Sequence, residues 1–427
     1  MNILPIITSE TQFNERLERR QQALDETRTS VSDILARVKK EGDRALRQLT
    51  ERFDGVRIDD LMVPDQQLEV GRGSLSGQME TTILAAAANI RTFHERQIPT
   101  GFAITRKDGM EAAWRWRPIQ RVGVYIPGGR YPLLSTILMT VIPAQVAGVA
   151  EIVVCTPPGP SGYPADAILG ICALLGIREV YRIGGAQAIA ALAYGTETIQ
   201  AVDKITGPGS IYVTSAKEAV SSQVGIDMLA GPSEVVVLAD STANPRWIAS
   251  DLISQAEHDP LAWSVLVTDN HNLAQEVNRH LAELLKDLTT RSIAEASLKE
   301  HGFIFLGENL ATCTAVTNRI APEHLCLQTA RPEDMLERVR AGAIFIGGET
   351  PVAWGDYWAG PSHTLPTAGH ARFQGPLSVY DFLVPYSVIK ADARTARVSG
   401  DKVKALAELE GLAGHALSIT LREENDD

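Results

Sequence analysis

The feature that most constrains the fold is a regular alternation of apolar strands, loops and helices that begins near residue 121. The stretches RVGVY, EIVVC, REVYRI and KIT are typical of strands, and each leads through a loop into a helical stretch such as AQAIAALAY. This order indicates a parallel sheet covered by helices, and the nearly continuous apolar strands fit burial on both faces. A second run of the same kind follows, with the strands WSVLVTD, GFIFLGE, HLCLQT and GAIFIGG. The sequence therefore predicts an α/β protein with two parallel-sheet units.

The segments that flank these units are mainly helical. Residues 11–54, residues 78–97 and the tail at 400–413 carry apolar side chains at helical spacing. Trp114 and Trp116 alternate with charged residues as in a half-exposed strand.

Two glycine-rich points, near residues 123 and 232, are the expected places where the chain crosses between domains. We therefore expect residues 1–122 and 233–377 to form one discontinuous α/β domain, with residues 123–232 forming the second. Residues 378–427 would form a helical tail.

Composition excludes some classes of protein. The 427 residues are 44% apolar and 22% charged, as in ordinary globular proteins. The formal net charge is −12, whereas general nucleic-acid binders and binders of anionic membranes are usually basic, so neither partner is expected. The N-terminal segment lacks a basic stretch followed by a long apolar core, and no run approaches about 18 apolar residues. We expect neither a signal peptide nor a membrane span.

The cysteines indicate a reducing compartment. Cys155, Cys172, Cys313 and Cys326 are widely separated and form no CxxC pair. Such spacing fits buried packing residues of a cytoplasmic protein better than a disulfide framework.

The polar run SQAEHDP follows an apolar helical stretch. If the run is helical, Gln255 and His258 share one face and Glu257 points elsewhere. Two nitrogen or oxygen donors on one face could hold a metal, or they could form a solvated helix end.

Two further histidines lie beside acidic residues. Glu323 and His324 stand at the start of the strand HLCLQT, where an acid and an imidazole could transfer protons at the edge of a sheet. A structural role for this pair remains equally open. Asp356 and His363 lie in one Gly- and Pro-rich loop, and loops of this composition often bind ligands.

Common cofactor and catalytic motifs are missing. The sequence contains no HExxH, GxxxxGK[ST], GxSxG or strict GxGxxG fingerprint. Three glycine loops, YIPGG (125–129), IGGAQ (183–187) and TGPGS (206–210), nevertheless connect strands to helices. Their backbone N–H groups could meet a phosphate at a helix N-terminus, or the glycines could serve tight turns alone.

Several longer runs occur in order along the chain: GVYIPGG, IGGAQAIAALAYGTE, VDKITGPG, GIDMLAGPSE, QAEHDP, APEHL, GPSHTLPT, ARF, PLSVYDF and EGLAGHA. In this order and spacing they resemble the histidinol dehydrogenase family over essentially the whole chain. The resemblance implies two incomplete Rossmann-like domains with small helical N- and C-terminal segments. It also implies that the C-terminal tail is exchanged between the subunits of a homodimer.

The resemblance also assigns site residues. It implies one Zn²⁺ per subunit, and the implied protein ligands are Gln255, His258, Asp356 and His415. The implied contacts to the substrate add Ser233, His324, His363 and Glu410 to these four ligands. The implied contacts to NAD are Tyr125, Gln187 and Ser210. The family usually carries Asn at the last of these positions, and the shorter serine side chain predicts weaker NAD binding or a bridging water.

The implied reaction oxidises L-histidinol through histidinal to L-histidine with two NAD⁺, the last step of histidine biosynthesis. His324 would accept the proton of the alcohol, and Glu323 would activate the water that adds to the aldehyde. The metal would mainly orient the substrate. The alternative is a related dehydrogenase of the same fold that acts on another amino or sulfo alcohol.

Overall fold

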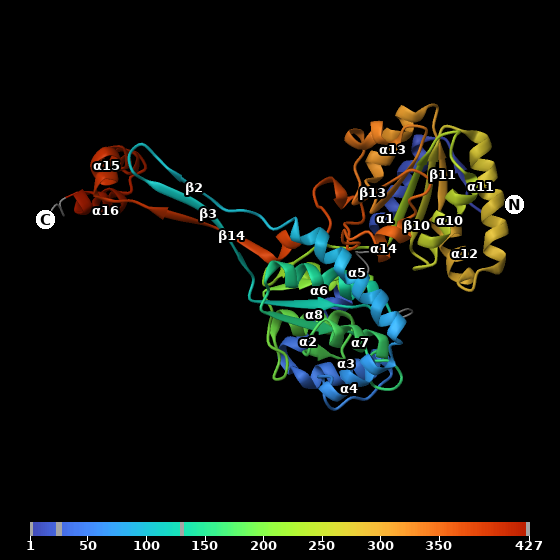
Figure 1. The fold of residues 1–427 in the computed structure, drawn as a ribbon, viewed down its shortest axis with the longest axis horizontal. Coiled ribbons are helices and arrows are strands. Elements are labelled where there is room, and N and C mark those ends of the chain that lie inside the picture. Colours follow the sequence, from blue (N-terminus) through green and yellow to red (C-terminus); the bar gives the residue numbers. More distant parts are fainter. Residues whose placement is uncertain (1–2, 23–27, 129–131, 424–427) are drawn as a thin grey trace. The chain divides into compact units, whose positions relative to one another are not determined.

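A computed structural model describes residues 3–22, 28–128 and 132–423 (Figure 1). The chain forms two compact units. Unit 1 contains Met1–Gln97 and Gln120–Phe382, and unit 2 contains Ile98–Ile119 and Leu383–Asp427. The predicted loop YIPGG extends into the undescribed segment at Gly129, and the predicted helix over 11–54 spans the undescribed residues 23–27.

The elements alternate along unit 1 as the sequence predicts. The strands are β1 Ile6–Ile7, β2 Phe102–Thr105, β3 Glu111–Pro118, β4 Arg121–Tyr125, β5 Glu151–Cys155, β6 Val180–Tyr181, β7 Lys204–Thr206, β8 Gly225–Ile226, β9 Glu234–Ala239, β10 Trp263–Thr268, β11 Phe303–Leu306, β12 His324–Gln328, β13 Ala343–Ile346 and β14 Leu383–Lys390. The helices are α1 Glu10–Gln22, α2 Arg28–Glu41, α3 Asp43–Asp54, α4 Asp65–Ser74, α5 Gly77–Glu95, α6 Leu134–Ala147, α7 Asp166–Leu174, α8 Gly185–Tyr194, α9 Ile211–Val220, α10 Pro245–Ala256, α11 His271–Leu284, α12 Arg291–Glu300, α13 Leu310–Ile320, α14 Val352–Tyr357, α15 Ala393–Leu409 and α16 Ala413–Glu423. Short 3-10 helices are η2 Leu285–Asp287, η3 Pro332–Arg338, η4 His370–Arg372 and η5 Val379–Phe382.

The first sheet of unit 1 is parallel, with the strand order β1-β11-β10-β9-β12-β13. Every residue of its central strands β9, β10 and β12 is buried, because helices cover both faces. The chain runs outward from β9 through β10 to β11 and later adds β12 on the other side of β9. The edge strand β1 was not predicted, since two residues carry no periodicity.

The second sheet is also parallel, with the order β6-β5-β4-β7-β8. Its strand order reverses at β4, and the loops that follow β6 and β7 lead directly into α8 and α9. The carboxyl ends of parallel strands at such a switch point are the usual place for a nucleotide. Both sheets together confirm the predicted α/β class.

The N-terminal helices differ from the expected domain assignment. α2 and α3 pack on α8 and α9 of the second sheet, and α4 packs on α7. Their buried side chains, including Leu35 and Leu46, join the core that contains Ile189. The expected boundary at residue 123 falls inside β4. Helical periodicity shows that a face is apolar but does not identify the sheet that it covers.

Unit 2 is an antiparallel sheet, β14-β3-β2, together with α15 and α16 (Figure 1). The predicted strand at Trp114 and Trp116 is β3. The predicted helix at 400–413 begins earlier, at Ala393, and ends at Leu409, where a separate helix follows. In the described part of the chain, no helix has the length and apolar content that crossing a membrane would need. All four cysteines are buried and free, as expected.

Candidate active site

Glu323 and His324 lie at the amino end of β12, beside the amino end of β9. α13 ends at Ile320, its C-cap residue Ala321 has φ 43°, and Pro322 then leads toward the strand. The parallel register pairs His324 with Val235, so Glu323 lies next to Glu234. Ligands of open α/β sheets usually bind at the carboxyl ends of the strands. This pair lies at the opposite, amino edge of the sheet.

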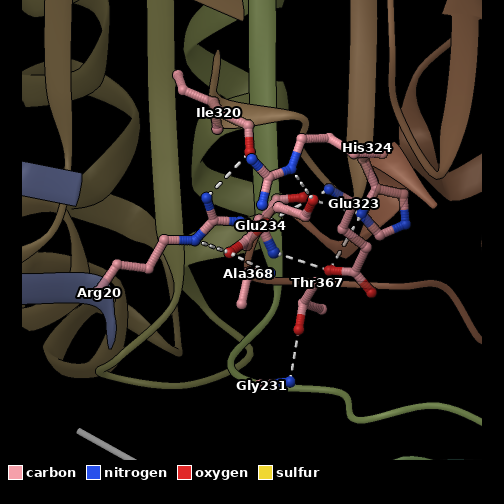
Figure 2. A network of polar contacts seen from close by, with 10 residues as sticks. Arg20, Gly231, Glu234, Ile320, Glu323, His324, Thr367 and Ala368 are labelled. Carbon is pink, nitrogen blue, oxygen red and sulfur yellow. Dashed lines mark hydrogen bonds and ion pairs between the residues drawn. The ribbon is translucent and has the colours of Figure 1, made fainter. Parts of the chain in front are cut away.

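The hydrogen bond of His324 defines its tautomer. Its Nδ1 lies 3.0 Å from the backbone carbonyl oxygen of Glu234, which can only accept a hydrogen bond (Figure 2). Nδ1 therefore carries a proton, and Nε2 of the neutral ring carries the lone pair. Nε2 is buried and has no hydrogen-bond partner among the described residues. A buried nitrogen without a partner can act as a base toward a bound substrate.

Glu323 is held by the same neighbouring residue. The backbone N–H of Glu234 donates to Oε2 of Glu323 over 2.8 Å, and this Oε2 lies 3.5 Å from Nδ1 of His324. Both side chains are buried, with residue exposures of 7% and 5%. Burial lowers the pKa of His324, but the Glu323 carboxylate and, further away, Asp356 more than offset it and raise the pKa to about 9.

Asp356 and His363 lie together, although Asp356 belongs to a short helix and not to the expected common loop. Asp356 is in α14, and its Oδ1 is 3.5 Å from Nδ1 of His363. Burial raises the pKa of Asp356, but His363, His324 and His258 lower it more, so the net shift is downward. Three imidazoles from three different segments therefore act on one carboxylate.

The run QAEHDP lies at the end of α10. A helix that follows a parallel strand runs back along the sheet, so the end of α10 returns to the amino ends of the strands. Gln255 is buried in the last turn of the helix, and the N–H of His258 still donates to the carbonyl of Gln255 over 3.3 Å. Glu257 is the C-cap residue of α10, and its side chain accepts a hydrogen bond from Thr290 over 2.6 Å.

These side chains offer the donor types that zinc accepts. An amide oxygen, an imidazole and a carboxylate come from Gln255, His258 and Asp356 in unit 1. Within the described ranges, no group of three or more His, Cys, Asp or Glu side chains is arranged to hold a metal ion. His415 and Glu410 are exposed and belong to unit 2. Ser233 directly precedes β9, and its carbonyl accepts a hydrogen bond from Trp263.

The residues expected to contact NAD lie at the carboxyl end of the second sheet. Tyr125 ends β4, and its hydroxyl accepts a hydrogen bond from the N–H of Gly185 over 3.1 Å. Gln187 lies in the first turn of α8, and Ser210 is the N-cap residue of α9 but makes no side-chain capping hydrogen bond. Gln187, Ser210 and Asp54 line a cavity of about 600 Å³. Two helix N-termini at one cavity form a favourable site for phosphate.

The sequence reasoning missed an ion pair under this site. Lys217 and Asp227 pair in the interior, and both also bind Gly207. Nζ of Lys217 donates to the carbonyl of Gly207 over 3.1 Å, and the N–H of Gly207 donates to Asp227 over 2.8 Å. The glycine has φ 108°, and a Cβ there would lie 2.1 Å from the carbonyl oxygen of Tyr125. A lysine within an apolar helical stretch was the available sequence signal.

The reasoning also missed the ion pair of Arg20 and Glu234, in which Glu234 lies between Arg20 and the pair of Glu323 and His324 (Figure 2). Glu234 is the last residue of the run GIDMLAGPSE, but its role depends on an arginine that is distant in the sequence. Periodicity and spacing cannot indicate such a pair.

Comparison with known proteins agrees with this architecture. The sequence profile described as Histidinol dehydrogenase matches residues 17–423. The histidinol dehydrogenase of Parasynechococcus marenigrum is 46% identical over 411 residues, which cover 96% of this chain and 94% of that protein. The Geobacillus kaustophilus protein is 47% identical over 404 residues, covering 94% and 95%. The crystal structure of histidinol dehydrogenase from Elizabethkingia anophelis matches with a TM-score of 0.93 at 35% identity and covers 99% of both chains.

Matching sheets, a shared profile and similarity over nearly the full length place the chain among the NAD-dependent oxidoreductases. The matched regions include the N-terminal helices as well as both parallel sheets. The chain belongs to the histidinol dehydrogenase family.

Proposed function

We propose that this protein is a zinc-dependent L-histidinol dehydrogenase that converts L-histidinol through histidinal to L-histidine with two NAD⁺, the last step of histidine biosynthesis. The observation that carries the proposal is the buried Nε2 of His324, which has no hydrogen-bond partner in the described ranges, on a ring whose other nitrogen, Nδ1, lies 3.5 Å from the Glu323 carboxylate. The nitrogen and oxygen donors of Gln255, His258 and Asp356 support a metal close to this pair.

The bound groups supply two kinds of chemistry. Zinc held by Gln255, His258, Asp356 and His415 would orient the substrate, and NAD⁺ would accept hydride. Ser233, His363 and Glu410 would complete the contacts to the substrate. Tyr125, Gln187 and Ser210 would hold the cofactor at the 600 Å³ cavity.

The chain's own residues would perform the proton transfers. Nε2 of His324 takes the proton from the hydroxyl oxygen while hydride leaves the carbon that bears this hydroxyl, which gives the aldehyde. Oε2 of Glu323 is engaged by the backbone of Glu234, so the remaining oxygen, Oε1, is the one placed to take a proton from water. The water adds to the aldehyde, and His324 then deprotonates the resulting gem-diol in the second oxidation. Two adjacent proton acceptors suit a sequence of two deprotonations and one hydration.

Unit 2 supports a homodimer with shared active sites. Its surface exposes large apolar side chains, with Leu409 at 84%, Ile389 at 71% and Leu406 at 64%. A monomer that leaves such side chains in water is unfavourable, and a second subunit would cover them. In this arrangement Glu410 and His415 would serve the partner's site. We place the enzyme in the cytoplasm, where free thiols such as that of Cys172 stay reduced.

Counting NADH against L-histidinol consumed by the zinc-loaded protein tests the proposal. We expect two NADH for each substrate, loss of activity with a chelator, and recovery when zinc is restored. A protein that binds zinc but forms no NADH from histidinol would contradict the proposal, and other amino and sulfo alcohols would then be screened.

A further inference from the structure

The N-terminal helix α1 places a buried cation behind the acid–base pair. Arg20 forms a two-pronged ion pair with Glu234, with Nε 2.5 Å from Oε1, and the two side chains are only 7% and 4% exposed. Its Nη1 also donates to the carbonyl of Ile320 over 3.0 Å, and its guanidinium lies 5.4 Å from the centre of the Trp263 ring. An arginine with all these partners is fixed in one orientation.

Glu234 connects this cation to both proton-transfer residues (Figure 2). Its carboxylate accepts hydrogen bonds from the backbone N–H of Glu323, over 3.4 Å, and of Ala368, over 3.1 Å. Its own backbone N–H and carbonyl bind the side chains of Glu323 and His324. A single residue therefore sets the orientation of the carboxylate and the tautomer of the imidazole.

The backbone around this pair is strained. Ala321 and Ala368, with φ 43° and φ 54°, are the two non-glycine residues with positive φ in the described part of the chain. Both alanines lie at hydrogen bonds of the Arg20–Glu234 ion pair. Arg20 donates to the carbonyl of Ile320, the residue before Ala321, and the N–H of Ala368 donates to the Glu234 carboxylate. Such conformations persist where surrounding contacts impose them, and they cluster at functional sites.

The two carboxylates would repel one another without a cation. Burial raises the pKa of Glu234 and Arg20 opposes this rise, while the charge of Glu323 adds to it. Without Arg20, a proton on Glu234 would weaken its hydrogen bonds to the N–H groups of Glu323 and Ala368.

We propose that Arg20 and Glu234 are positioning residues for the reaction, which hold Glu323 and His324 in their productive orientation and keep Nε2 of His324 free to accept protons. Neither side chain needs to touch the substrate. Because α1 supplies the cation, the N-terminal helix is part of the machinery of the active site. The activity measurements below rest on the proposed function.

The test compares zinc-loaded Glu234→Gln, Arg20→Met and Arg20→Lys with a matched control. Arg16→Met is that control, because Arg16 also lies on α1, donates to the carbonyl of Glu300 over 3.1 Å and has its guanidinium 5.9 Å from the centre of the Phe303 ring. We expect Glu234→Gln and Arg20→Met to lower kcat on the order of 10- to 100-fold, with the KM for histidinol changed less than about twofold. Arg20→Lys keeps the positive charge but loses the two parallel hydrogen bonds that a guanidinium donates to a carboxylate. Its kcat should therefore lie between those of Arg20→Met and the wild type.

Two results would overturn the inference. One is a kcat for both neutral variants within twofold of Arg16→Met, even with lower thermal stability, which would make the pair purely structural. The other is a wild-type His324 that is protonated at Nε2 in the neutral ring. Nitrogen NMR of labelled histidine, recorded above the pKa of about 9 so that the ring is neutral, decides the tautomer, with the signal assigned by its loss in His324→Asn. This measurement needs no turnover, so it separates failure of the inference from failure of the proposed function.

Discussion

Lys217 and Asp227 form an ion pair whose side chains are 2% and 0% exposed, directly beneath the loop that leads to Ser210. Both members also bind Gly207, one through its carbonyl and one through its N–H. The pair therefore fixes the backbone of the loop at the expected NAD site.

Replacing Lys217 with Met should lower the free energy of unfolding by about 3–5 kcal/mol, because it leaves Asp227 buried without its cation. The KM for NAD⁺ should also rise, since the loop loses its anchor. Denaturant unfolding and NAD⁺ titration measure the two effects. Arg178→Met is the matched control: it breaks the exposed pair with Glu69, where both side chains are about half exposed, and should cost at most about 1 kcal/mol. Equal losses in the two variants would contradict the role of the buried pair.

Replacing Gly207 with Ala should unfold the loop or the domain. The new Cβ would lie 2.1 Å from the carbonyl oxygen of Tyr125, in addition to the backbone strain at φ 108°. Gly176→Ala separates these causes, because Gly176 has φ 76° but open space around it. We expect the control to lose only about 1–2 kcal/mol of folding stability, which is the cost of the left-handed conformation alone. Thermal melts of the two variants distinguish the steric clash from the backbone strain. Similar midpoints would show that the loop moves to accept the methyl group.

Asp251 should make the protein less stable as the pH rises. Burial raises its pKa to about 6, and its Oδ2 accepts a hydrogen bond from Gln328 over 2.7 Å. A carboxyl with a raised pKa binds its proton more tightly in the folded state, so stability declines between about pH 4 and pH 6 and stays lower above. Asp251→Asn is neutral, and its amide could donate to Oε1 of Gln328, which has no hydrogen-bond partner among the described residues. Its melting temperature should exceed that of the wild type by a few degrees at pH 7.5, with the difference vanishing near pH 4.

Asp240 provides a control of opposite sign. Burial raises its pKa, but hydrogen bonds from Thr242 and Ala330 lower it more, so the net shift is downward. The stabilisation from this carboxylate is present above its unfolded pKa and is lost as the pH falls through the lower folded value. Asp240→Asn should therefore reduce stability at pH 7.5. A gain in both asparagine variants would mean that general charge reduction, and not the local environment, controls stability.

Replacing Glu323 with Gln should separate the two oxidations. Oxidation of histidinol should keep most of its rate, because His324 remains, while oxidation of supplied histidinal should fall by about 10²–10⁴-fold for lack of a base for water. His324→Asn should lose both steps while retaining zinc. NADH formation from each substrate provides the measurement. Parallel losses in both steps of Glu323→Gln would contradict the proposed division of roles.

Mixing inactive His324→Asn with inactive His415→Asn should restore activity if each site combines unit 1 of one subunit with unit 2 of the other. Random exchange of subunits predicts about one quarter of wild-type activity, since half of the dimers are mixed and each has one intact site. Mixing His415→Asn with Glu410→Gln is the control, because both changes lie in unit 2 and every shared site stays damaged. No recovery in the first mixture would place the whole site within one subunit.

Part of the architecture could be predicted from sequence because it depends on local patterns. Apolar strands that alternate with helices specified two parallel sheets, and the strand at Trp114 and Trp116 could be predicted in the same way. The acid and imidazole at 323 and 324 stood out because they directly precede an apolar strand. The assignment of α2–α4 to the wrong sheet shows the limit: an apolar helical face fits many partners, and only packing selects one.

What the sequence determined by itself is the class of fold and the order of its strands along the chain, because hydrophobic period and glycine loops act over a few residues. The tertiary structure decided which residues from distant parts of the chain meet at the ends of the strands. It brought Glu323 and His324 against Glu234 at the amino edge of one sheet, and Tyr125, Gln187 and Ser210 to the carboxyl edge of the other. It also joined Arg20 to Glu234 and Lys217 to Asp227. Buried charges such as these need partners that satisfy them in space, and that requirement is independent of separation along the chain.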